Sequence, residues 1–192
     1  MKKRTTMLAL LLATGAGTCL QAQEKLTQFK VRDAITVRTP IMNDSINPKG
    51  EKYADKDLLK TPVVLDLADA PFQVLSTDTA GVLSFPKAEK DHSIYLLETS
   101  LRAERFMTGK LKVTSPARWE IFINGESKMS KENAEDSISG ASTREVNLRL
   151  EPEADYEITI KLLSGSKDKA VPTLKCELIK DDKFKDITCF VS

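Results

Sequence analysis

Apolar and polar residues alternate along several short segments of the chain, most clearly at 111–113, 146–150 and 156–162. Successive side chains of a β-strand point to opposite sides of the sheet, so this pattern predicts strands with one buried and one wet face. Further strands are expected at 71–76, 82–85, 93–106, 118–123, 173–180 and 187–191. Because no convincing amphipathic helix lies between them, we predict an all-β fold, an antiparallel jelly-roll-like β-sandwich of about eight or nine strands.

The first 22 residues have the features of a signal peptide. Positive Lys2–Arg4 precede an apolar run at 7–13, and this run is too short to span a bilayer. Signal peptidase could cut after Ala22, or Cys19 could become a lipidated N-terminus, although Ala16-Gly17-Thr18 departs from a lipobox at two places. Release of the mature chain as a soluble protein is therefore favoured over a lipid anchor at Cys19. Either route predicts a periplasmic or extracellular protein, and no later run is long enough for a membrane span.

The mature chain is expected to have two parts. Residues 23–60 contain one short alternating stretch and several turn formers, which predicts an extended, loosely structured leader. Residues 61–192 would form the sandwich domain. Within it, residues 124–144 are almost entirely polar or small and predict one long loop, either a mobile insertion or a ligand-binding loop.

Charge limits the choice of partners. The chain has 29 Lys and Arg against 28 Asp and Glu. Three of the positive charges, Lys2, Lys3 and Arg4, lie in the predicted signal peptide, so the mature chain keeps 26 basic against 28 acidic residues, a net charge of −2. Nucleic acids and anionic membranes require clustered positive charge, and both are therefore excluded as expected partners.

The residues offer little for catalysis. His92 is the single histidine, and its charged neighbours predict a surface turn residue. A serine or cysteine nucleophile needs a positioned base and commonly a Gly-x-Ser-x-Gly elbow, and the sequence contains no such elbow. We therefore predict a non-enzymatic protein with no catalytic residues.

Metal binding is expected to be equally weak. The spacings that bind zinc or iron, such as Cys-x-x-Cys and His-Glu-x-x-His, do not occur. Calcium remains open, because acidic loop residues could supply oxygen ligands, although solvated acidic turns are favoured. The candidates are the pairs Asp66 and Asp69, Glu135 and Asp136, and Asp181 and Asp182.

Cys176 and Cys189 each share a strand face with apolar neighbours, so both side chains should point into the core. If 173–180 and 187–191 form a hairpin, the two cysteines lie directly opposite one another. An oxidising compartment favours a disulfide, whereas the β-carbon spacing of opposed residues, about 4.5–5.5 Å, favours two buried thiols. Both alternatives stay open.

Aromatic residues near one turn suggest a binding surface. Trp119 alternates with Ile121 and Ile123 and is therefore expected in the core rather than exposed to a sugar. Phe122 has the opposite orientation. Phe122, with the Asn124-Gly125 turn that closes its strand, is therefore the predicted binding surface.

Three tripeptides of the form Asp-Ser/Thr-aliphatic place Ser45, Thr79 and Ser137 in predicted loops. They resemble the acceptor motif of the general O-glycosylation system of some Gram-negative periplasms. Composition alone predicts about one match in such a chain. The three hydroxyls are candidate glycosylation sites, and ordinary turn chemistry is the alternative.

A strand, a turn, a second strand and Asn124-Gly125 follow one another in 109–126, and this order resembles galactose-binding-like jelly rolls. Over residues 40–190 the order of elements also resembles the N-terminal non-catalytic domain of secreted bacterial serine peptidases of the prolyl-oligopeptidase class. It is carried by Pro71-Phe72, 78–81, 95–97, 109–126 and 156–163. The resemblance implies an accessory domain without peptidase activity, acting through a protein partner or a parent peptidase. The alternative is a glycan-binding module.

Overall fold

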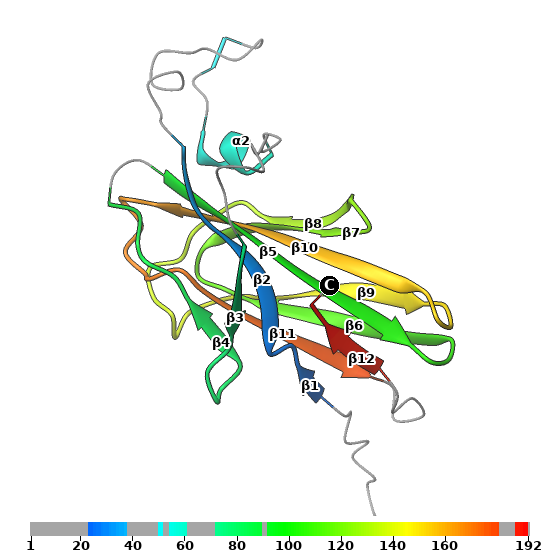
Figure 1. Ribbon diagram of the computed structural model, residues 1–192. Helices are drawn as coiled ribbons and strands as arrows, with labels where there is room; N and C mark the ends of the chain where they lie inside the picture. The colour runs from blue at the N-terminus through cyan, green and yellow to red at the C-terminus, as the bar shows by residue number, and fades with distance from the viewer. Residues whose placement is uncertain are drawn as a thin grey trace, which may run out of the picture.

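The computed structural model describes residues 23–37, 50–51, 54–60, 72–89, 92–180 and 187–191. They form two antiparallel sheets packed face to face, so the predicted all-β sandwich is confirmed (Figure 1). In this part of the chain no helix is long and apolar enough to cross a membrane. The predicted signal peptide, with Cys19 and Ala22, lies outside the described residues.

One sheet has five strands and the other has seven. The five-stranded sheet has the order β1 (Gln23–Lys25), β11 (Thr173–Lys180), β6 (Met107–Thr114), β9 (Thr143–Leu150), with β4 (Val82–Ser84) also paired to β11. The seven-stranded sheet has the order β3 (Phe72–Ser76), β2 (Gln28–Val37), β5 (His92–Ala103), β10 (Asp155–Gly165), β7 (Arg118–Ile123), β8 (Glu126–Lys131). The last strand, β12 (Ile187–Phe190), pairs with the end of β5 that β2 leaves free.

The predicted leader is corrected over residues 23–37. These residues contribute β1 to one sheet and β2 to the other, and between them the Leu26 amide donates to the Cys176 carbonyl at 3.0 Å. Leu26 and Phe29 are each only 1% exposed. The short alternation around Phe29 was the visible signal, and pairing with β3 and β5 is what makes it a ten-residue strand.

The predicted long loop at 124–144 is also corrected. Asn124 and Gly125 have φ values of 50° and 76°, as a tight hairpin turn requires, and the chain returns at once as β8. Only residues 132–142 then lie outside a strand. The polar composition of β8 hid it, because an edge strand with a mostly exposed pattern lacks the apolar signal of an inner strand.

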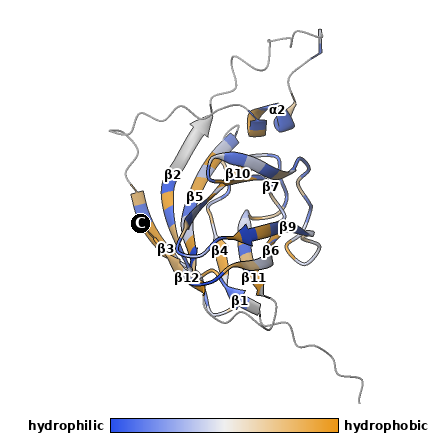
Figure 2. Cartoon of the chain, turned by 90° about the vertical axis from the view of Figure 1, so that its right-hand side faces the viewer, coloured by the Kyte–Doolittle hydropathy of each residue, from blue (hydrophilic) through white to orange (hydrophobic). Residues whose placement is uncertain are grey.

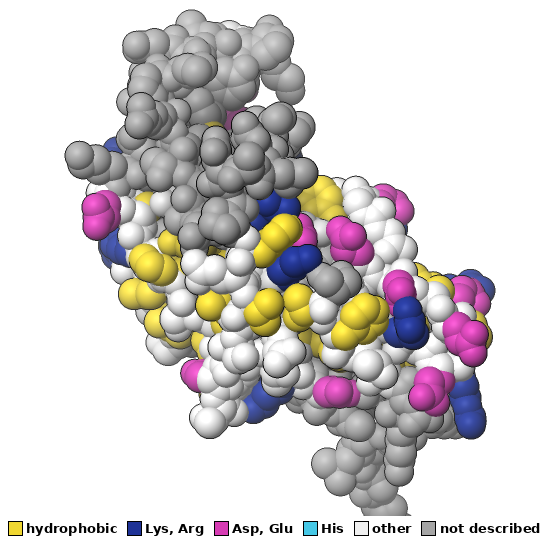
Figure 3. Space-filling model, in the orientation of Figure 1, with side chains coloured by type: hydrophobic (Ala, Val, Ile, Leu, Met, Phe, Trp, Pro, Cys, Tyr) yellow, Lys and Arg dark blue, Asp and Glu magenta, His cyan; other side chains and the backbone are white. Residues whose placement is uncertain are grey.

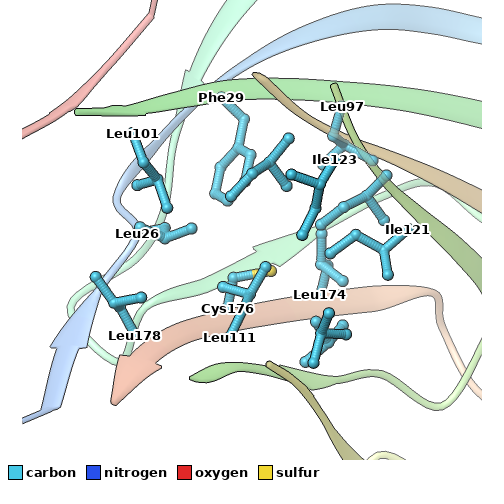
Figure 4. Packing of buried hydrophobic residues seen from close by; sticks show 14 of the residues in the cluster. Leu26, Phe29, Leu97, Leu101, Leu111, Ile121, Ile123, Leu174, Cys176 and Leu178 are labelled. Atoms are coloured by element: carbon cyan, nitrogen blue, oxygen red, sulfur yellow. The ribbon is translucent and has the colours of Figure 1, made fainter. Parts of the chain in front are cut away.

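The core fills the space between the two sheets. Figure 4 shows Leu26 and Phe29 pointing toward residues of the five-stranded sheet such as Leu111 and Leu178. Trp119 is completely buried in this cluster, which confirms its predicted core position. Burial of such a large side chain contributes strongly to stability, because the hydrophobic effect scales with the apolar area removed from water.

The predicted hairpin between the two cysteine strands is wrong. Cys176 lies on β11 opposite Val113 of the five-stranded sheet, whereas Cys189 lies on β12 opposite Leu101 of the seven-stranded sheet. Both cysteines are free thiols in this structure, Cys176 buried and Cys189 half-buried. Burial raises the pKa of the Cys176 thiol well above its usual range.

The one helix among the described residues, α2 (Asp55–Lys60), covers part of the outer face of the seven-stranded sheet, where it lies over β7 and β10 (Figure 2). Leu58 and Leu59 are buried against Ile94 and Leu163 in a second, smaller apolar cluster. At the end of the helix, the Lys161 ammonium donates to the carbonyls of Leu58 at 3.1 Å and Leu59 at 2.5 Å. These carbonyls have no partner within the helix, so the lysine satisfies them and holds the helix on the sheet.

Candidate functional site

A pocket of about 280 Å³ opens between the two sheets, where the edge strands β8 and β9 face one another. The turn after β7 and the start of β10 complete its lining. Away from the pocket, Arg144 of β9 bridges the same two edges by donating to the Ser130 carbonyl of β8 at 3.3 Å. The pocket therefore lies between the edges of two different sheets, which the Arg144 side chain links at another point.

The pocket has an apolar floor and one aromatic wall. Ile123, Leu148 and Leu150 line it with side chains that are at most 8% exposed. Tyr156 is half-buried, and its hydroxyl oxygen accepts the Glu151 amide at 2.9 Å. Accepting this bond fixes the ring and leaves the hydroxyl proton free to donate to a ligand.

Charged groups from β8 form one side of the rim. The pairing of β7 with β8 shifts between Ile121, opposite Met129, and Phe122, opposite Ser127, so Lys128 is an extra, bulged residue. The bulge brings the Lys128 ammonium to 2.6 Å from Glu126 Oε2. Bulges redirect side chains, and this one places a carboxylate and an ammonium together at the pocket mouth.

The other side of the rim comes from β9. Asn147 and Arg149 are exposed positions that alternate with the buried Leu148 and Leu150. The Arg149 guanidinium lies 5.1 Å from the ring centre of Phe106 and its Nε lies 3.4 Å from a Glu151 carboxylate oxygen. Phe106 is 41% exposed, so this guanidinium covers an aromatic surface beside the pocket.

Asn124 locks the hairpin turn to β10. Its backbone amide donates to the Glu157 carbonyl, and its side-chain Oδ1 accepts the Glu157 amide, both at 2.8 Å. The side-chain nitrogen therefore remains to donate at the pocket rim. Gly125 is exposed, and nothing lies within 4 Å of the position that a β-carbon would take.

The predicted binding surface is only partly brought together. Asn124 lines the pocket, whereas Phe122 lies on the outer face of the seven-stranded sheet, opposite Thr159 and Ser127. Strand alternation separates Phe122 from the pocket, because Ile123 points into the pocket and the adjacent Phe122 points to the opposite face of the sheet. Whether Phe122 or Gly125 binds a ligand stays a prediction.

Sequence reasoning missed most of the lining, namely Glu126, Lys128, Asn147, Arg149 and Tyr156. The polar positions of the alternating segment 146–150 were visible as a wet strand face. Nothing local indicated that this face borders β8, because the two segments meet only across the sandwich.

The prediction that His92 is a surface turn residue is wrong. It begins β5, its side chain is 16% exposed, and its Nε2 lies 3.1 Å from Asp55 Oδ1. Arg118 joins the same group, with its guanidinium 2.7 Å from Asp55 and 2.8 Å from Asp168. The hydrogen bond to His92 and the charge of Arg118 lower the pKa of the Asp55 carboxyl.

This cluster ties α2 to the sheet rather than activating a nucleophile. His92 Nδ1 is buried without a partner, and Nε2 is engaged by Asp55, so neither nitrogen is hydrogen-bonded to a hydroxyl or thiol of the described residues. A general base must reach the proton that it removes. The absence of catalytic residues remains a prediction.

The acidic residues suggested for calcium have different environments. Glu135 lies 3.2 Å from the Lys131 ammonium and accepts the Ser142 amide, and Asp136 lies 2.5 Å from the Lys169 ammonium. Among the described residues no group of three or more His, Cys, Asp or Glu is arranged to hold a metal ion. Asp66, Asp69, Asp181 and Asp182 lie outside the described residues, so the calcium question stays open there.

Comparison with known proteins shows only distant likeness. No family model and no curated protein matches the sequence. The PA14 sugar-binding domain from an RTX adhesin is 17% identical with a TM-score of 0.37, over 52% of this chain and 52% of that chain. A family 35 carbohydrate-binding module from an environmental isolate is 11% identical with a TM-score of 0.36, over 55% of this chain and 75% of that chain.

A β-glucosidase from Kluyveromyces marxianus, solved in complex with glucose, is 12% identical with a TM-score of 0.44. The match covers 82% of this chain but 16% of the glucosidase, and the chain spans about half the length of the adhesin domain. Likeness at this level assigns neither a family nor a function.

Proposed function

We propose that this protein is an exported, non-catalytic binding module that holds a hydroxyl-rich ligand, a short glycan, in the pocket between β8 and β9. The observation that carries the proposal is the lining itself, an apolar floor with a polar rim contributed by both sheets. Export rests on the signal peptide predicted at residues 1–22.

The chemistry of the rim suits a sugar. A pyranose presents hydroxyl groups that both donate and accept, together with apolar C–H surfaces. Asn124 and Asn147 supply amide donors and acceptors, Glu126 accepts, and Arg149 donates. Tyr156 and the aliphatic floor can contact the C–H surfaces.

The size of the pocket limits the ligand. Its volume, about 280 Å³, is at the lower end of the roughly 300–1,000 Å³ found for ligand pockets. We therefore expect one or two sugar units to be bound inside, with the remainder of a longer glycan in solvent.

The experiment is a glycan array probed with the mature chain, followed by calorimetric titration of the best ligand. Arg149→Ala should weaken binding about 10- to 100-fold, since a hydrogen bond from a charged donor contributes about 1.5–3 kcal/mol. Arg105→Ala is the matched control, because it removes the same side chain from an exposed position outside the pocket lining. An equal loss in both variants, or no ligand on the array, would contradict the proposal.

The second candidate is an accessory domain that contacts a protein, including a parent peptidase. It is supported by two exposed apolar residues on β3, Phe72 at 39% and Val74 at 61% exposed. The charged groups of Lys30 and Arg32 lie 4.4 Å and 3.7 Å from the centre of the Phe72 ring. Figure 3 shows hydrophobic side chains along the face on which β3 and β12 lie. A hydrolase reading frame continuing or adjoining downstream of Ser192 would support this candidate, provided that Val74→Asp disrupts co-purification with that hydrolase.

A further inference from the structure

Two of the three Asp-Ser/Thr-aliphatic tripeptides lie in described residues, and both occupy exposed turns. Asp78-Thr79-Ala80 connects β3 to β4, and Asp136-Ser137-Ile138 lies between β8 and β9. Ser45 lies outside the described residues. The sequence motif does not distinguish the hydroxyls of Thr79 and Ser137, but their surroundings in the structure can be compared.

The turn at 78–82 is tightly organised. The Gly81 amide donates to the Asp78 carbonyl at 2.9 Å, and the Asp78 amide donates to the Val82 carbonyl at 3.0 Å. The Asp78 carboxylate accepts the Val82 amide at 2.8 Å, and Gly81 adopts a φ of +83°, which favours glycine. These bonds place Thr79 and Ala80 at the tip of the turn.

Thr79 presents an unengaged hydroxyl. Its backbone carbonyl accepts the Lys25 ammonium at 3.1 Å, but its side chain is exposed and its Oγ1 has no hydrogen-bond partner in the described part of the chain. In contrast, Ser137 Oγ accepts the Gly140 amide at 3.1 Å and lies 3.3 Å from Ser139 Oγ. Modification of Ser137 would disturb its own turn, whereas modification of Thr79 would disturb no contact in the described residues.

We propose that Thr79 is the attachment site of an O-linked glycan, added after export. The donor class is a glycan activated through a lipid pyrophosphate, and a transferase supplies the base. The Thr79 oxygen forms a bond to the anomeric carbon as the bond from that carbon to the phosphate oxygen breaks. The lipid pyrophosphate leaves with the electron pair, and the hydroxyl proton passes to the base of the transferase.

The attachment site does not overlap the candidate pocket. In Figure 1 the turn between β3 and β4 projects at the lower left, whereas β9 ends at the right of the sandwich. No residue of the turn lines the pocket. Glycosylation of Thr79 is therefore independent of ligand binding in the pocket, so either proposal can fail without the other.

The test is the intact mass and peptide map of the full chain purified after expression in its source organism, compared with the same chain made in a cytoplasm. We expect the exported protein to be heavier by whole sugar residues, located on the peptide containing Thr79. Thr79→Ala should abolish this increment and Thr79→Ser should retain it. Asp78→Asn, which keeps the oxygen that accepts the Val82 amide but removes the acidic charge, should also abolish it.

Ser84→Ala is the matched control, because Ser84 is an exposed hydroxyl on β4 without a preceding aspartate. This variant should keep the full increment. An exported wild-type chain with the unmodified mass, or a glycan found on Ser137 with none on Thr79, would overturn the proposal.

Discussion

Lys131 should be one of the most important polar residues for stability. Its side chain is 3% exposed, and its ammonium donates to the carbonyls of Ser115, Pro116 and Ala117 at 3.0–3.1 Å. It also lies 3.2 Å from the Glu135 carboxylate. One cation thus joins the turn between β6 and β7 to the segment after β8. Burial lowers the pKa of the Lys131 ammonium, and the Glu135 carboxylate opposes that shift.

Lys131→Met keeps most of the buried aliphatic chain and removes the charge. It removes the ammonium from three carbonyls and a carboxylate, although Pro116 keeps the Glu135 amide and Glu135 keeps the Ser142 amide. Breaking a buried charged contact in this way costs about 3–5 kcal/mol. Because Glu135 is 28% exposed and can regain water, we expect the lower value, about 3 kcal/mol. For a chain of this size the loss corresponds to a fall in Tm of about 10 °C.

The assay is urea unfolding together with thermal denaturation, with Lys128→Met as the matched control. Lys128 is on the same strand and pairs with Glu126, but at the surface, where an ion pair contributes about 0.5 kcal/mol or less. If the two variants were destabilised within about 1 kcal/mol of one another, the assigned role of Lys131 would be refuted.

Two further predictions concern titration and thiol reactivity. The hydrogen bond from His92 lowers the pKa of the Asp55 carboxyl in the folded protein below its unfolded-state value, near 3.8. The carboxylate therefore stabilises the fold fully above pH 3.8, and this contribution is lost as the pH falls through the lower folded-state pKa. Asp55→Asn should therefore lose less stability than wild type in urea titrations between about pH 4 and pH 2, and an equal loss would contradict the assignment. Cys189 should react with a thiol reagent in the native protein, while Cys176 should react only after unfolding, because Cys176 is fully buried and the pKa of its thiol is raised. Equal reaction rates of the two thiols in the native protein, or no titratable thiol in the purified protein, would refute this.

The strands themselves were largely predictable. Segments 146–150 and 156–162 lie within β9 and β10, because alternation is a local consequence of strand geometry and needs no knowledge of the partner strands. Trp119 was assigned correctly to the core for the same reason. In contrast, β8 was missed because its exposed pattern resembles a loop, and the leader was misjudged because β1 and β2 become strands only by pairing with distant segments.

The candidate site was much less predictable. Asn124 was identified because an Asn-Gly pair has its own turn preference, but Arg149 and Tyr156 join it only when β9 and β10 reach the same end of the sandwich. The cluster of Asp55, His92 and Arg118 likewise unites residues from a helix and two strands. Charge and composition around each residue carry no information about such partners.

The sequence by itself therefore determined the class of fold, an antiparallel sandwich, since the period of two lies in neighbouring residues. Only the tertiary structure decided which sheet each strand joins. Successive strands β11 and β12 illustrate this, because they pair with β6 and β5 in opposite sheets and carry Cys176 and Cys189 away from a common hairpin. The physical reason is that pairing depends on burial and register between segments far apart in the chain, and the pocket between β8 and β9 exists only after those pairings are made.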